Sequence, residues 1–82
     1  MYKTIPVYPI LAKVTHKEGV VVLQATISTA GAIENLRAVS GDLMLREAAI
    51  EAVSNWRYRP YLLNGQPVEV ETTVNVVFRM TQ

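Results

Sequence analysis

Residues 68–80, VEVETTVNVVFRM, decide the fold of this 82-residue chain. Every second residue from Val68 to Met80 is apolar or a threonine, the residues between them are mostly polar, and neither glycine nor proline interrupts the run. A period of two places alternate side chains on opposite faces of a β-strand, and valine and threonine favour strands. The stretch therefore predicts one long, half-buried strand of about 43 Å.

Two further strands are predicted closer to the N-terminus. Residues 19–28 alternate in the same way, with Val21, Leu23 and Ile27 on one face. A turn at residues 29–32 contains glycine, and residues 33–39 are again rich in β-branched side chains. The two strands are therefore expected to pair as a hairpin.

An amphipathic helix is predicted over residues 43–56. Its apolar residues recur at the three- and four-residue spacing of a single helical face. Asp42 precedes it and can cap the first turn, because its carboxylate accepts a hydrogen bond from an unpaired N–H there. Pro60 disfavours helical backbone before it, so the helix should end near Trp56 or Arg57.

The order strand, strand, helix, strand predicts an α+β domain of two layers (β-β-α-β), with one helix packed on one face of a three-stranded antiparallel sheet. The predicted division is an extended N-terminal segment over residues 1–18, with a short helical turn at residues 10–14, and a folded domain over residues 19–82. The expected core residues are Val21, Leu23, Ile27, Leu45, Ala49, Trp56, Val74 and Phe78.

The last strand should extend beyond its helical cover, since a helix over residues 43–56 is only about 21 Å long. If the hairpin occupies one edge of this strand, the other edge carries unpaired N–H and C=O groups that a further strand can use. Tyr8 and Pro9 are additional candidates, with Tyr8 either a recognition residue or a plug at the end of the sheet. The strand residues expected to bind a peptide are Val70, Glu71, Thr72, Thr73, Val74, Asn75, Val76 and Val77.

The composition argues against catalysis and against nucleic-acid binding. Eight Lys and Arg against seven Asp and Glu give a net charge of only +1. The absence of cysteine and the single His16, in a polar segment, predict no metal site, no thiol nucleophile and no cofactor. Glu69 and Glu71 share the solvent side of the last strand, where they are expected to aid solubility. The longest apolar stretches are too short for a membrane span.

Four sequence features occur in a specific order. They are Tyr8-Pro9 followed by Ala12, Glu18-Gly19 opening a strand that reaches Gly31, Trp56-Arg57-Tyr58-Arg59-Pro60 after the alanine-rich helix, and Val74-Asn75-Val76-Val77-Phe78 in the last strand. With these features the chain resembles the carboxy-terminal domain of TonB-type energy transducers, from about Ile5 to Met80.

The resemblance implies a non-enzymatic periplasmic module whose last strand captures the TonB box of an outer-membrane transporter by β-augmentation. It also implies that the module couples proton-motive force to siderophore or nutrient uptake. A single N-terminal helix outside these 82 residues would anchor the full-length protein in the inner membrane and engage an ExbB/ExbD-type motor. Residues 19–82 would then be the TonB-like domain.

The residues leave an alternative open, in which the domain is a self-associating structural or sensor module of a transducer paralog without a transporter partner. Val20, Val22 and Val77 make the uncovered face of the sheet more apolar than water favours, so either the segment from Tyr2 to Ile10 folds over it or another chain does. A homodimer that uses the edge of the last strand, and so competes with peptide capture, is therefore expected at high concentration.

Overall fold

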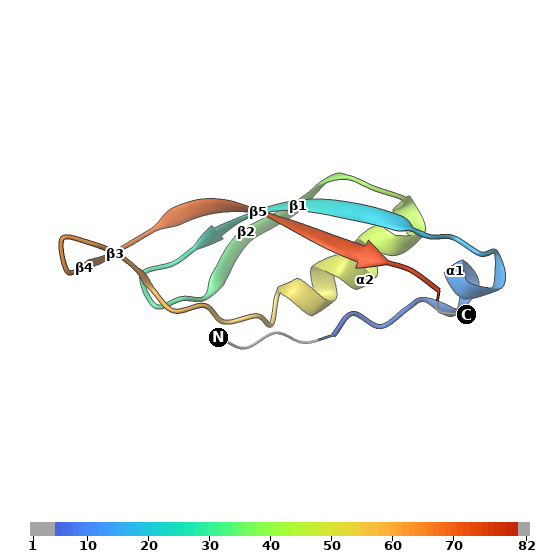
Figure 1. Cartoon of the computed structure of the whole chain (residues 1–82), viewed down its shortest axis with the longest axis horizontal. Coiled ribbons are helices and arrows are strands. Elements are labelled where there is room, and N and C mark those ends of the chain that lie inside the picture. The colour runs from blue at the N-terminus through green and yellow to red at the C-terminus, as the bar shows by residue number, and fades with distance from the viewer. Residues whose placement is uncertain (1–4, 81–82) are drawn as a thin grey trace.

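The computed structural model describes residues 5–80. Three strands form an antiparallel sheet in the order β2-β1-β5, and α2 covers one face of it (Figure 1). The predicted two-layer α+β architecture is therefore confirmed. In chain order the elements are α1 (Ile10–Val14), β1 (Gly19–Ile27), β2 (Ile33–Ser40), α2 (Leu43–Val53), β3 (Tyr61–Leu63), β4 (Gln66–Val68) and β5 (Val70–Phe78).

The central strand β1 pairs differently with its two neighbours. With β5 it keeps one unbroken antiparallel register, from Gly19 opposite Phe78 to Ile27 opposite Val70. Its register with β2 is interrupted, and Asn35 lies there with a φ of 49°, a conformation that asparagine tolerates better than most residues. A bulge of this kind increases local twist, whereas β5 keeps a regular ladder along its whole length.

The cap of α2 forms as predicted, but the helix is shorter than expected. The Met44 N–H donates to Asp42 Oδ1 over 2.8 Å, which satisfies one of the unpaired donors of the first turn. The helix ends at Val53, and the prediction that it continues to Trp56 or Arg57 is wrong. The side chains of Ser54 and Asn55 both donate to the Glu51 carbonyl, and such bonds compete with the helical ladder.

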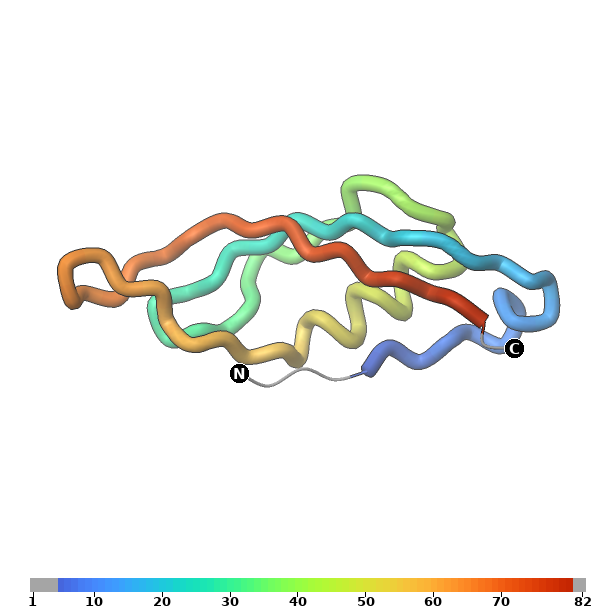
Figure 2. The backbone as a smooth tube through the Cα atoms, viewed as in Figure 1, coloured from blue at the N-terminus to red at the C-terminus, as the bar shows by residue number. Residues whose placement is uncertain are grey.

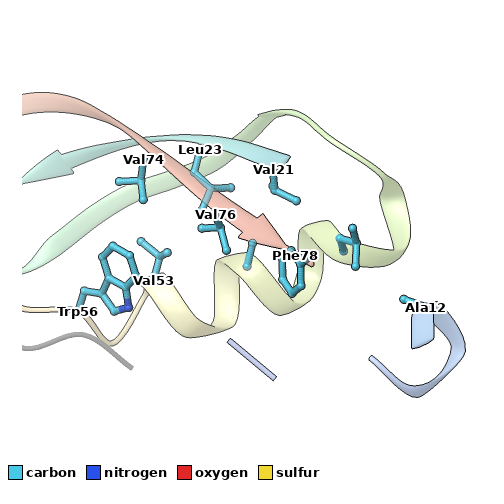
Figure 3. Close-up of a cluster of buried hydrophobic side chains, with 10 residues drawn as sticks. Ala12, Val21, Leu23, Val53, Trp56, Val74, Val76 and Phe78 are labelled. Atoms are coloured by element: carbon cyan, nitrogen blue, oxygen red, sulfur yellow. The ribbon is translucent and has the colours of Figure 1, made fainter. Parts of the chain in front are cut away.

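The core lies between the sheet and α2. Figure 3 shows Val21 and Leu23 of β1 and Val74, Val76 and Phe78 of β5 pointing toward the helix. Trp56 lies beyond the end of α2 and is nevertheless only 8% exposed, because its ring belongs to the same core cluster as Val53 and Val74 (Figure 3). The eight residues expected in the core are all buried: Val21, Leu23, Ile27, Leu45, Ala49, Trp56, Val74 and Phe78.

The prediction of a single thirteen-residue strand is wrong. β5 spans nine residues, Val70–Phe78, because β1 offers pairing partners only from Gly19 to Ile27. Val68 instead pairs with Tyr61 in a separate two-stranded sheet of β3 and β4. The turn between them has positive φ at Asn64 and Gly65, which a tight hairpin turn of this sequence adopts. Residues 5–80 therefore form five strands in two sheets.

The molecule is elongated, with the β3–β4 hairpin projecting at one end and α1 at the other (Figure 2). The extended segment before α1 runs along the side of α2 that faces away from the sheet. An ion pair between Lys17 Nζ and Asp42 Oδ2, at 3.6 Å, joins the end of this N-terminal region to the start of α2. Within residues 5–80, neither helix has the length and apolar character needed to cross a membrane.

Candidate functional site

The outer edge of β5 is open. All nine residues of β5 pair with β1, and β5 is the last strand of the sheet. Outside this pairing, no backbone–backbone hydrogen bond of the described chain reaches Val70–Phe78. In an antiparallel ladder alternate residues direct both backbone groups to the same side, so half of the N–H and C=O groups of β5 face away from β1. At about 30 Å, the edge is long enough to pair with a peptide of several residues.

The two faces of β5 differ in chemistry. Val74, Val76 and Phe78 are buried against α2, whereas Glu71, Thr73, Asn75 and Val77 are exposed on the other face. The eight candidate strand residues thus lie in one continuous ladder and offer an added strand their backbone groups. The exposed side chains are Glu71, Thr73, Asn75 and Val77, while Val70 and Thr72 are half-buried and Val74 and Val76 are buried.

Tyr8 lies at the C-terminal end of β5 rather than along its edge. Its ring packs edge-on against Phe78, and its hydroxyl donates a hydrogen bond to the Lys17 carbonyl. Desolvation, and secondarily the Glu18 carboxylate, raise the pKa of the Tyr8 hydroxyl. Pro9 is the N-cap of α1, and its carbonyl accepts a hydrogen bond from the Lys13 N–H over 3.0 Å. Tyr8 therefore has the position of a plug at the end of the sheet, and its role in recognition stays a prediction.

Glu18 makes a contact that the sequence did not predict. Its Oε2 accepts a hydrogen bond from the Met80 N–H over 2.7 Å, just beyond the end of β5. The contact follows from the register, because Gly19 lies opposite Phe78 and brings Glu18 beside the next residues of the chain. A sequence pattern carries no such register, so only the pairing of the strands reveals this contact.

The face of the sheet opposite α2 is partly apolar. Val20, Val39 and Val77 are 44%, 54% and 55% exposed, and Val20 lies directly opposite Val77 in the ladder. Burial of these three side chains would be favourable, because apolar area removed from water stabilises a contact. This face adjoins the open edge, so a partner that pairs with β5 can also cover it.

The remaining candidate residues, for metal binding, for catalysis and for stacking on bases, do not form a site in the described chain. Within residues 5–80, His, Asp and Glu side chains form no cluster that could hold a metal ion. Glu69 and Glu71 are exposed, and His16 is exposed in the turn after α1. Trp56 is buried, so the aromatic and basic residues around it do not form an open stacking surface for bases.

Residues 4–80 match the family model described as Gram-negative bacterial TonB protein C-terminal. The chain is 29% identical over 77 residues to Protein TonB of Vibrio cholerae, covering 92% of this chain and 32% of that protein. It therefore spans about a third of the length of this curated relative. In structure it is similar to the TonB C-terminal domain of Pseudomonas aeruginosa, with a TM-score of 0.83, 25% identity and coverage of 100% of this chain and 85% of the other. The TonB2 protein of Vibrio anguillarum gives a TM-score of 0.74 at 32% identity, covering 100% and 80%.

The TonB family consists of energy transducers rather than enzymes. Its C-terminal domain is periplasmic in Gram-negative bacteria, and the family interacts with outer-membrane transporters. The family match spans all of the described residues, including the open edge of β5. This chain therefore belongs to the Gram-negative bacterial TonB protein C-terminal family.

Proposed function

We propose that this domain captures the TonB box of an outer-membrane transporter as an added strand on the open edge of β5. The single observation that carries the proposal is the unbroken pairing of β5 with β1 on one side only. An exposed, regular edge strand is what β-augmentation requires, because main-chain hydrogen bonds supply the affinity. Main-chain bonds depend little on sequence, so one domain can serve several transporters.

The expected affinity is modest. About six new hydrogen bonds, each worth about 1 kcal/mol, are opposed by several kcal/mol of association cost. A dissociation constant in the micromolar range is the expected result. Such a complex forms and releases readily, which suits a coupler that must let its transporter go after each pull.

The same geometry suits force transmission. β1 and β5 share nine pairs, so a pull along the strands loads many hydrogen bonds at once. We infer that the full-length protein is tethered to the inner membrane and coupled there to an ExbB/ExbD-type motor that uses proton-motive force. Through β5, the pull would reach the box peptide and then the transporter.

Self-association through the β5 edge is the second candidate function. Val77 of β5 and Val20 of β1 are exposed beside that edge, and a second copy could cover them while its own β5 pairs with this one. A two-fold contact of this kind satisfies both edges. It would compete with peptide capture, because both events need the same backbone groups.

Binding of labelled TonB-box peptides tests the proposal. A peptide N-methylated at alternate residues loses half of its backbone donors, and one of the two alternate sets should abolish binding. A peptide with scrambled side chains keeps all its donors and should retain most of the affinity. Equal binding by both N-methylated peptides and the parent would show that capture does not use main-chain pairing.

A further inference from the structure

A groove of about 450 Å³ lies between α2 and the extended N-terminal segment. Its apolar lining includes Ile5, Val7, Met44 and Ala48. Ile5 and Val7 are 89% and 77% exposed, so apolar surface here is open to water. Burial of such surface by another molecule would be favourable. The groove is separate from the open edge of β5, because none of its lining residues belongs to the sheet.

The rim of the groove is acidic. Glu47 and Glu51 line it from successive turns of α2, and both are exposed. Neither has a cationic partner within residues 5–80, where the single ion pair joins Lys17 to Asp42. Like charges four residues apart destabilise a helix, so a cation from outside the chain would relieve their repulsion. The groove therefore suits a segment that is apolar at its tip and basic beside it.

The β3–β4 hairpin has this chemistry. It projects from one end of the molecule (Figure 1), and its first strand exposes Tyr61, Leu62 and Leu63 by 58–59%. Arg57 and Arg59, both exposed, lie in the segment that leads into it. Tyr61 and Leu63 share one face of this strand, because side chains alternate along it, and adjoining exposed apolar side chains are typical of a contact surface.

We propose that the α2 groove binds the β3–β4 hairpin of a second copy of this chain. The side chains of Tyr61 and Leu63 enter the groove, and Arg57 and Arg59 lie against Glu47 and Glu51 on its rim. Each copy carries one hairpin and one groove, so a two-fold arrangement forms two equal contacts and closes the dimer. The proposal goes beyond peptide capture, since the β5 edge of each copy stays open in this dimer.

Sedimentation over a wide concentration range, with saturating TonB-box peptide, tests the proposal. The wild-type domain should associate, and the peptide should leave this association unchanged. Two charge-reversed variants, Glu47→Arg/Glu51→Arg and Arg57→Glu/Arg59→Glu, should each weaken it by about tenfold or more, because like charges then meet at both contacts. An equimolar mixture of the two variants should restore it, since each hairpin then meets a groove of opposite charge.

A second pair of substitutions leaves the charges unchanged. Tyr61→Ser/Leu63→Ser alters two largely exposed side chains on one face of the hairpin and should weaken association about as much as charge reversal. A strict monomer at all concentrations would overturn the proposal, as would a mixture of charge variants that fails to associate. Dissociation by the box peptide would also overturn it, and would place the contact on the β5 edge while leaving peptide capture intact.

Discussion

The ring of Tyr8 packs edge-on against the ring of Phe78, with centroids 5.4 Å apart and ring planes at 86°. This contact joins the extended N-terminal segment to the last residue of β5. The Tyr8 hydroxyl bonds the Lys17 carbonyl, and Glu18 accepts from the Met80 N–H, so the same end of β5 is fastened at neighbouring points. If the chain is pulled from its N-terminal side, these contacts deliver load to the strand that we propose holds the peptide.

The phenol of Tyr8 should make stability fall in alkaline solution. Desolvation and Glu18 raise its pKa above the ordinary value of about 10, and burial also raises the pKa of Tyr58. As pH rises, both phenols ionise at a lower pH in the unfolded chain than in the folded one. The stability that they contribute is therefore complete below about pH 10 and is lost as pH rises through the folded-state pKa. Urea unfolding between pH 8 and pH 12 should show this loss, and Tyr8→Phe/Tyr58→Phe should reduce it. An unchanged pH profile in the double variant would contradict the assignment.

Trp56 should be the most costly single residue to truncate in the core. It is 8% exposed and lies between the end of α2 and β5, so Trp56→Ala should lower the free energy of unfolding by about 3–5 kcal/mol. Tyr61→Ala is the matched control, because Tyr61 is 59% exposed and its loss should cost about 0.5 kcal/mol or less. Thermal unfolding of the two variants at similar midpoints would contradict the burial of Trp56.

Gly31 should not tolerate a side chain. It has a φ of 84°, and a Cβ atom there would lie 1.9 Å from the Tyr58 carbonyl oxygen. The Tyr58 N–H donates to the Gly31 carbonyl over 2.8 Å, so the two segments cannot separate without losing this bond. Gly65 is the matched control, with a φ of 79° but open space around its Cβ position.

Alanine at either glycine adopts a left-handed conformation, which costs about 1–2 kcal/mol. Gly31→Ala should cost distinctly more, because the clash with Tyr58 is added to this strain. Urea unfolding of both variants measures the difference. Equal losses of stability would show that the chain at Tyr58 moves aside freely.

Proline substitution along β5 should separate folding from peptide capture. The N–H groups of Thr72 and Thr73 point to opposite sides of the strand, one toward β1 and one toward the open edge. Of Thr72→Pro and Thr73→Pro, one should therefore destabilise the sheet, and the other should leave it folded and abolish capture. Thr72→Val and Thr73→Val keep both donors and should retain stability and binding. If the proline variant that stays folded binds the peptide with full affinity, capture does not use the open edge of β5.

Much of the sheet could be predicted because its residues alternate so regularly. Val21 and Leu23 lie on the same side as Val74 and Val76, and period two alone places each pair on one face. The length of β5 could not be predicted in this way. Val68 continues the alternation, yet it pairs with Tyr61, and alternation does not state which strand a residue pairs with.

Contacts between segments that are distant in the sequence could not be predicted from the residue pattern either. Tyr8 was predicted as either a recognition residue or a plug, since its position on Phe78 depends on how the extended segment folds back. The bond from the Met80 N–H to Glu18 depends on the register between β1 and β5. Each of these features rests on packing geometry rather than on residue type.

An amide chemical-shift titration of the isotope-labelled domain with a TonB-box peptide measures directly whether the peptide pairs with β5. Capture on the open edge of β5 predicts that the largest chemical-shift changes lie in β5 and in the facing residues of β1. Alternate amides of β5 should also exchange more slowly with solvent once the peptide is bound, because their outward N–H groups become paired. Shifts confined to the α2 groove, with the β5 amides unchanged in position and in exchange rate, would contradict capture on the open edge.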